Sequence, residues 1–261
     1  MVAVSTTAWG LGSVKRRSTT DQVLHELRTA ILAGRIKPRE QLPEVALAQT
    51  FGTGRSAIRE ALRQLVQEGL VVSELNRGAW VRPLSAEDVI DVYRARAVIE
   101  VAGVRAAQER PAHSDLTGLR AAQARISAAC GATNGDKNPS REVIAADIDF
   151  HRELVALAGS PRLSRAHEPL AAESQMLLNW HPVYSISDYA SDHQKLLDAL
   201  ENADQDAAEV VRAHLILSED LILQEAERYA SRLASADSLV TEGAAERLTN
   251  DDVVDNEGSS G

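Results

Sequence analysis

Residues 52–69 read GTGRSAIREALRQLVQEG, a glycine-rich turn followed by one amphipathic helix. Apolar residues recur at helical spacing and predict a buried stripe made of Ala57, Ile58, Ala61, Leu62 and Leu65. Arginines recur at i, i+4 and i+8 on the opposite face, at Arg55, Arg59 and Arg63. The stretch therefore predicts a short helix that packs on one side and presents guanidinium groups on the other.

The segments on either side complete a small domain. Upstream, apolar residues at helical spacing predict helices over about 19–34 and 43–52. Downstream, two β-like runs, 70–72 and 79–81, flank the turn residues 76–78. Three helices followed by a hairpin predict a winged helix-turn-helix, whose third helix enters the major groove of DNA.

The exposed face of the third helix carries candidate DNA-binding residues. Arginine contacts guanine edges with two hydrogen bonds or clamps phosphates, which suits Arg55, Arg59 and Arg63. Ser56, near the start of the helix, is placed to bond a phosphate. The alternative is a solvated helix face whose arginines pair with neighbouring carboxylates. The order of turn, arginine ridge and hairpin favours DNA binding.

Charge is distributed unevenly along the chain. Residues 1–83 carry 12 Lys and Arg against 7 Asp and Glu, a net charge of +5. Residues 84–261 carry 16 against 31, a net of −15, and the two sum to the −10 of the whole chain. A basic front on an acidic chain suggests a polyanionic partner for the front part, although chance also produces an excess of this size.

Length and composition exclude several classes of protein. A chain of 261 residues with 44% hydrophobic and 25% charged residues suits one large or two medium soluble domains. The single cysteine, Cys130, excludes an internal disulfide framework and fits a reducing compartment. Apolar runs stay well below the roughly 18 residues of a membrane span, so we expect no membrane association.

Beyond Pro83 almost every segment has helical periodicity. Breaks at proline, glycine and polar clusters separate six predicted helices of an antiparallel bundle, at about 86–109, 113–131, 139–159, 161–180, 187–201 and 204–232. The predicted fold is therefore mainly α, with a winged-helix domain over 18–83 and an all-helical domain over 84–232. Residues 1–17 are expected to form a flexible arm, and 233–261 a disordered acidic tail.

Four residues of the helical half have a spacing that suits a metal ion. Asp147 and His151 stand at i and i+4, so both project from one face of a helix. His193 and His214 reach similar heights on two successive helices if these are antiparallel. Three imidazoles and one carboxylate suit Zn²⁺, Ni²⁺ or Mn²⁺. The alternative is a set of hydrogen-bonded core histidines, and Asp149 is expected to face away.

The remaining histidines lack a partner at useful spacing and are expected to be surface or core residues: His25, His113, His167 and His181.

Two parts of the chain resemble a known family. Residues 23–82 resemble the winged-helix domain of GntR-type bacterial transcriptional regulators, through LRTAILAGRIKP at 27–38, GRSAIREAL at 54–62, EGLV at 68–71 and NRGA at 76–79. The rest resembles the all-helical FCD ligand-binding domain of the FadR subfamily, and six helices are typical of its VanR branch. Its markers here are Arg94 to Arg96 with Glu100, 147–151, His193 with 196–200, and His214-Leu215. The chain departs from the pattern at Arg39, where glycine is usual, and at Gly54, where serine or threonine is usual.

The resemblance implies a ligand-responsive transcriptional regulator, with repressor as the expected direction. Such a protein is a homodimer in the bacterial cytoplasm, associated with the nucleoid, and binds a pseudo-palindromic operator in double-stranded DNA. A small organic acid or related metabolite changes its operator affinity. On this reading Arg77 and Gly78 match the wing tip that reaches the minor groove, in addition to the third-helix residues.

The resemblance also implies which residues of the helical domain bind a metal ion and an effector. Its divalent metal motif falls on Asp147, His151, His193 and His214, and Arg96 matches an arginine that pairs with an effector carboxylate. An ion pair of Arg96 with Glu100 at i+4 is the alternative for that residue. Two alternative functions remain open: a winged-helix protein with a purely structural metal, and a metalloenzyme.

Overall fold

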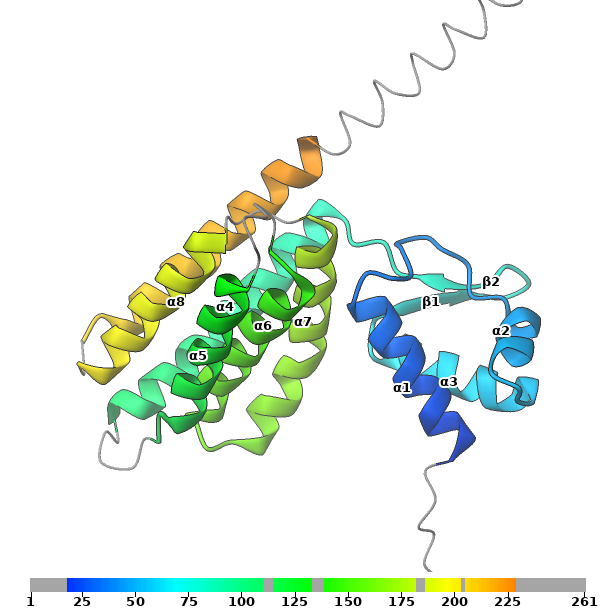
Figure 1. Ribbon diagram of the computed structural model, residues 1–261, viewed down its shortest axis with the longest axis horizontal. Helices are drawn as coiled ribbons and strands as arrows, with labels where there is room; N and C mark the ends of the chain where they lie inside the picture. The colour runs from blue at the N-terminus through cyan, green and yellow to red at the C-terminus, as the bar shows by residue number, and fades with distance from the viewer. Residues whose placement is uncertain (1–17, 110–114, 133–138, 182–185, 203–204, 229–261) are drawn as a thin grey trace, which may run out of the picture. The chain divides into compact units, whose positions relative to one another are not determined.

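The computed structural model of the chain describes residues 18–109, 115–132, 139–181, 186–202 and 205–228 (Figure 1). The chain divides into two compact units, Met1–Pro83 and Leu84–Gly261, and each is described by itself. The arm predicted for 1–17 and the tail predicted for 233–261 lie outside the described residues, as does His113.

The first unit is a winged helix-turn-helix, as predicted. Its elements are α1 (Thr19–Leu32), α2 (Glu44–Thr50), α3 (Arg55–Gln67), β1 (Val71–Glu74) and β2 (Gly78–Val81). The two strands pair antiparallel, from Val71 with Val81 to Glu74 with Gly78. The stripe predicted for α3 is buried at Ile58, Ala61, Leu62 and Leu65, and faces the buried Val23, Leu24, Leu27 and Ile31 of α1. Arg28 of α1 pairs with Glu68 at the end of α3. The apolar stripe therefore fixes which face of α3 stays exposed.

The turn before α2 keeps a glycine-like conformation although arginine stands there. Arg39 has φ +65°, and its backbone N–H donates to the carbonyl of Val81 at 2.9 Å. A left-handed conformation costs a non-glycine residue roughly 1–2 kcal/mol, so the surrounding hydrogen bonds hold the turn in place. The wing turn uses Asn76 and Gly78 at φ +64° and +91°, and β1 extends two residues beyond the predicted run.

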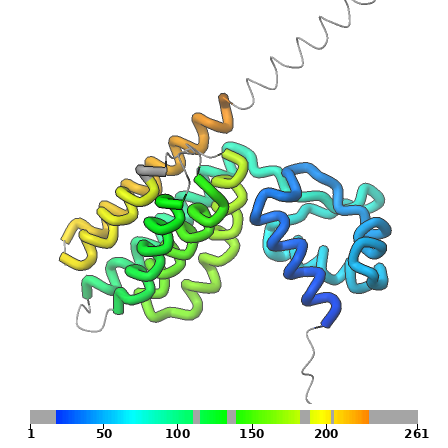
Figure 2. The backbone as a smooth tube through the Cα atoms, viewed as in Figure 1, coloured from blue at the N-terminus to red at the C-terminus, as the bar shows by residue number. Residues whose placement is uncertain are grey.

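The second unit is a bundle of helices. It contains α4 (Ala86–Glu109), α5 (Thr117–Gly131), α6 (Arg141–Ala156), α7 (Pro161–Trp180), α8 (Ile186–Glu201) and a last helix over 207–228, which lies beside α4 and α8 in the tube view (Figure 2). The bounds of α4 and α7 are those predicted from the sequence. The prediction that the third bundle helix continues to residue 159 is wrong, because α6 ends at Ala156 and the chain turns through Gly159 at φ +59°. The fifth predicted helix begins one residue earlier than expected, at Ile186.

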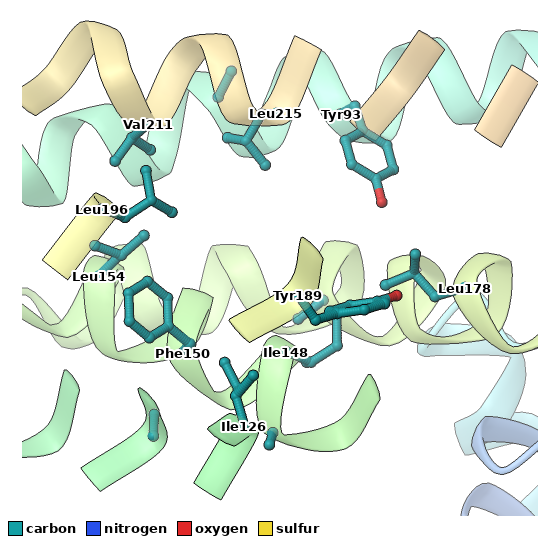
Figure 3. Packing of buried hydrophobic residues seen from close by; sticks show 14 of the residues in the cluster. Tyr93, Ile126, Ile148, Phe150, Leu154, Leu178, Tyr189, Leu196, Val211 and Leu215 are labelled. Atoms are coloured by element: carbon teal, nitrogen blue, oxygen red, sulfur yellow. The ribbon is translucent and has the colours of Figure 1, made fainter. Parts of the chain in front are cut away.

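The helices α4 and α6 approach each other closely in the interior of the bundle. A Cβ atom on Gly103 of α4 would collide with the backbone carbonyl of Leu154 in α6. Glycine therefore lets two backbones meet where a larger residue would separate them. Figure 3 shows Tyr93 reaching from α4 toward the helices on the opposite side of the core, where Phe150 and Tyr189 lie. One turn before Gly103, α4 carries Glu100, which faces α6 across this short gap.

None of the helices among the described residues combines the length and apolarity needed to cross a membrane.

Candidate functional site

The first unit has a groove of about 770 Å³ between α2, α3 and the wing. Five of the six candidate DNA-binding residues line it: Arg55, Arg59, Arg63, Arg77 and Gly78. Ser56 is exposed at the second position of α3 but is not among the lining residues. Gly54 is the N-cap of α3 and supplies no side-chain cap. The groove therefore gathers the arginines of α3 and of the wing on one concave surface.

Each arginine of the groove has a carboxylate partner. Glu44, the first residue of α2, accepts from Arg59 Nε at 2.8 and 2.9 Å and from Arg55 Nη2 at 3.4 Å. Arg63 pairs with Glu60, and Arg77 pairs with Glu74, each at i, i+3. Exposed pairs of this kind contribute about 0–1 kcal/mol. Since so little energy holds these two i, i+3 pairs, Arg63 and Arg77 can exchange their carboxylates for phosphates or base edges.

In the second unit, three histidines from three helices meet in the bundle interior. Ring nitrogens of His151 (α6), His193 (α8) and His214 (last helix) all lie within 4.8 Å of one another. Nε2 of His193 is 3.4 Å from Nε2 of His151 and 2.9 Å from Oδ1 of Asp147. His151 and His193 are 1% exposed and His214 is half-buried. The structure thus brings the three predicted histidine ligands together and places the fourth predicted ligand, Asp147, in contact with His193.

Neighbouring acceptors orient two of these imidazoles. Nδ1 of His193 donates to the carbonyl of Tyr189 at 2.8 Å, and Nδ1 of His151 donates to Oε2 of Glu100 at 2.6 Å. A proton on Nδ1 leaves the Nε2 lone pair pointing into the cluster. Metal-binding histidines characteristically donate their other N–H to a carboxylate or a backbone carbonyl. The donor set and its outer hydrogen bonds therefore fit a divalent cation.

The electrostatics of the cluster also favour a cation. Burial by itself would raise the pKa of Asp147, but His193, together with His151 and Arg96, outweighs burial and lowers that pKa to about 2. Burial opposes charge on His193 as well, yet the Asp147 carboxylate raises the pKa of His193 above its ordinary value. Burial and the two other imidazoles hold the pKa of His214 well below its ordinary value. A carboxylate oxygen and an imidazole nitrogen at 2.9 Å share either a proton or a metal ion.

Arg96 lies beside this cluster and is 1% exposed. Its Nε donates to Oε1 of Glu100 at 2.8 Å, and its guanidinium carbon lies 4.9 Å from the centre of the Tyr93 ring. Its Nη2 is buried and has no hydrogen-bond partner among the described residues. The ion pair with Glu100 is therefore present, and it leaves one donor of Arg96 available. An unpaired buried donor costs about 1–3 kcal/mol, which an anionic ligand would recover.

Sequence reasoning offered Glu100 as the ion-pair partner of Arg96 but missed its contacts with His151 and His167. Glu100 is fully buried and accepts from Arg96, from His151 and from His167 Nε2, the last at 3.0 Å. His167, on α7, is 1% exposed and is one of the histidines expected to lack a partner. The available signal was a charged pair at i, i+4 within an otherwise apolar helix face of α4. Asp149 faces away, as expected, and pairs with Arg125 and Arg152 at 3.0 Å each.

Comparisons with known proteins agree with both units. Residues 19–81 match the model of the bacterial regulatory proteins of the gntR family, and residues 91–217 match the FCD domain. A probable D-xylose utilization operon transcriptional repressor of Paenarthrobacter nicotinovorans is 30% identical over 202 residues, which cover 76% of this chain and 86% of that protein. The galactonate operon transcriptional repressor of Escherichia coli is 26% identical over 229 residues, 79% of this chain and 97% of the relative.

A solved structure supports the same assignment. The crystal structure of a putative transcriptional regulator GntR from a Rhodococcus species superposes with a TM-score of 0.71 at 28% identity, and covers 80% of this chain and 99% of that one. Both domains therefore occur together, in the same order, in proteins of one kind. The chain belongs to the GntR family of DNA-binding transcriptional regulators and carries the FCD domain as its second unit.

Proposed function

We propose that this chain is a repressor whose operator affinity changes when a small carboxylate effector binds beside a divalent metal ion in the helical bundle. The observation that carries the proposal is the buried cluster of Asp147, His151, His193 and His214 next to the available Nη2 of Arg96. A family of regulators rather than enzymes leaves the metalloenzyme alternative without support. Its place of action would be the nucleoid of a bacterial cytoplasm.

The four clustered side chains would hold Zn²⁺, Ni²⁺ or Mn²⁺. A bound ion would supply positive charge and open coordination positions for an anionic ligand. Glu100 and the carbonyl of Tyr189 hold two of the imidazoles in the required orientation. His214 is the half-buried member, so the approach of a ligand from its side is the one that requires the least displacement of protein atoms.

Arg96 would receive one carboxylate of the effector. Its free Nη2 is fixed by the Nε hydrogen bond to Glu100 and by the Tyr93 ring, so little side-chain entropy is lost on binding. Glu100 sits on α4, the helix that begins directly after the winged-helix unit. An effector that binds two arrangements of α4 unequally would change operator affinity by about 1–3 kcal/mol. If the metal is purely structural, operator affinity is expected to stay unchanged across a panel of small carboxylic acids. This measurement therefore distinguishes a structural metal from one that takes part in effector binding.

Replacing Arg59 with alanine is expected to weaken operator binding by about 1–3 kcal/mol, or roughly 5- to 150-fold in Kd. Arg59 lines the groove, is 56% exposed and presents its guanidinium to solvent. The operator would be obtained by selection from random-sequence duplexes with the wild-type protein. Fluorescence anisotropy on that operator measures the Kd. Arg125→Ala removes the same charge from the bundle and serves as the control. Wild-type affinity in Arg59→Ala would contradict the recognition-helix assignment.

We propose that the protein is a homodimer through the outer face of α4 and the last helix. Val98 and Ile216 are 70% and 51% exposed on this face. They line a groove of about 460 Å³, together with Tyr93, Arg94, Ala97, Arg212 and Glu219. The lining carries both signs of charge, since Arg94 and Arg212 share it with Glu219. A face with apolar residues and both charges is self-complementary, as the two-fold interface of a homodimer requires.

Val98→Glu is expected to convert the dimer to a monomer, because it places a charge in the apolar part of the interface. Light scattering after gel filtration measures the molar mass. Leu217→Glu is the matched control: Leu217 is also exposed, at 47%, but does not line the groove. A monomeric wild-type protein, or a Val98→Glu variant that remains dimeric, would contradict this interface.

A further inference from the structure

Glu44 occupies an unexpected place for a carboxylate. It lines the groove in which DNA is expected to bind, and its negative charge opposes the phosphates. Its side chain is 30% exposed and bridges from α2 to two arginines of α3. The other two carboxylates that pair with groove arginines, Glu60 and Glu74, pair with a residue three positions away in the chain. Among the described residues, Glu44 is therefore the carboxylate of the groove that connects two separate helices, α2 and α3.

Glu44 accepts its hydrogen bonds from the Nε atom of Arg59, which bears on how the rest of the guanidinium is presented. Both carboxylate oxygens accept from Nε, at 2.9 and 2.8 Å. The two terminal amino groups of Arg59 make no hydrogen bond within the described part of the chain. Arginine reads guanine with a planar pair of donors that must reach O6 and N7 together. An arginine held at Nε presents its terminal donors in a fixed direction, whereas an unheld arginine has about 2 kcal/mol of rotamer entropy to lose.

We propose that Glu44 is a positioning residue that sets the DNA specificity of this protein. By holding Arg59, and more loosely Arg55, it restricts these side chains to the base edges in front of them. Its charge also weakens complexes in which the arginines would bind phosphates alone. The carboxylate thus lowers binding to unrelated DNA and sharpens the preference for the operator, a use of repulsion for selectivity. The inference rests on the proposed binding of DNA in this groove.

The test compares preferred sequences rather than affinity alone. Operators are selected in vitro from random duplexes with the full-length wild type, Glu44→Ala, Arg59→Ala and Arg55→Ala. Glu44→Ala is expected to lose sequence preference at the same base pairs as Arg59→Ala. The ratio of affinities for the operator and for an unrelated duplex of equal length is expected to fall roughly 10-fold or more, the value of one bidentate base contact. Glu44→Gln, which keeps the shape of the side chain, guards against an effect of local unfolding in α2 and is expected to lose part of the preference.

Glu60→Ala is the matched control. It removes the same charge from the same unit and breaks the pair with Arg63, but connects no separate elements. It is expected to strengthen binding to all duplexes and to keep the operator preference. If Glu44→Ala selects the same sequences with the same affinity ratio as Glu60→Ala, the inference is wrong. A changed preference at base pairs that Arg59→Ala and Arg55→Ala both leave intact would show that Glu44 reads a base directly, which also overturns a positioning role. If the wild type selects no sequence, the proposed function itself fails.

Discussion

Loss of stoichiometric metal binding is the expected result of replacing His193 with alanine. Nε2 of His193 lies 2.9 Å from Asp147 and 3.4 Å from His151, so it meets two of the other three candidate ligands. Removal of an outer-shell partner of a ligand typically costs 10- to 100-fold in metal affinity, and removal of a ligand costs more. Metal analysis of the tag-free protein after reloading with Zn²⁺, Ni²⁺ or Mn²⁺ is expected to give about one ion per chain for the wild type. His193→Ala is expected to retain none.

Two further variants make the result specific. His214→Ala removes the half-buried member of the cluster and is expected to lose the ion with less risk to the fold. His25→Ala changes an exposed residue of α1 and is expected to keep the ion. Added Zn²⁺ raises the Tm of the wild type because it binds the folded state, and leaves the Tm of His193→Ala unchanged. Full occupancy in both His193→Ala and His214→Ala would show that the four-residue site is wrong.

Local signals account for the accuracy of the helix predictions. The start of α4 is marked by Ser85, whose hydroxyl accepts from the backbone N–H of Asp88 at 3.1 Å, while the Asp88 carboxylate accepts from the backbone N–H of Ser85 at 2.8 Å. The start of α7 is marked by Ser160 as N-cap and Pro161 in the first turn. Such signals act within a few residues and are visible in sequence. The end of α6 was missed because Leu157 and Ala158 favour helix, whereas the left-handed conformation of Gly159 is set by the turn into α7.

The contacts of the candidate site also divide into those that are local in sequence and those that depend on how the helices pack. Asp147 and His151 share a helix face, which spacing alone predicts. Glu100 and His167 meet across 67 residues of sequence, and their contact depends on how α4 packs against α7. Equally, the carbonyl of Tyr189 that orients His193 is a backbone group with no mark in the sequence. The candidate ligands could therefore be predicted from the sequence, whereas the groups that orient them depend on how the bundle packs.

The buried ion pair of α4 gives the largest stability effect. Replacing Arg96 with leucine is expected to destabilise the metal-free protein by about 3–5 kcal/mol, because it leaves the Glu100 carboxylate fully buried without its guanidinium partner. Burial alone would raise the pKa of Glu100, but Arg96 and His151 hold that pKa well below its ordinary value. A carboxyl with a lowered pKa in the folded state stabilises it above the pKa of the unfolded chain, and this contribution is lost as the pH falls.

Because the pKa of Glu100 is lowered in the folded protein, the stability of the Arg96→Leu variant is expected to have a distinctive pH dependence. Without Arg96, Glu100 is expected to take up a proton more readily in the folded state, so the difference from wild type is greatest near neutral pH and shrinks below about pH 4. Urea unfolding followed by circular dichroism at several pH values measures the difference. Arg125→Leu is the matched control: its pair with Asp149 has side chains 56% and 39% exposed, and its loss is expected to cost less than about 1 kcal/mol. Equal losses in the two variants, or an Arg96→Leu deficit that persists unchanged in acid, would mean that Glu100 is not held as a buried anion. In that case the bundle would hold Arg96 by packing against Tyr93 alone, and its role as a fixed donor for an effector carboxylate would have to be abandoned.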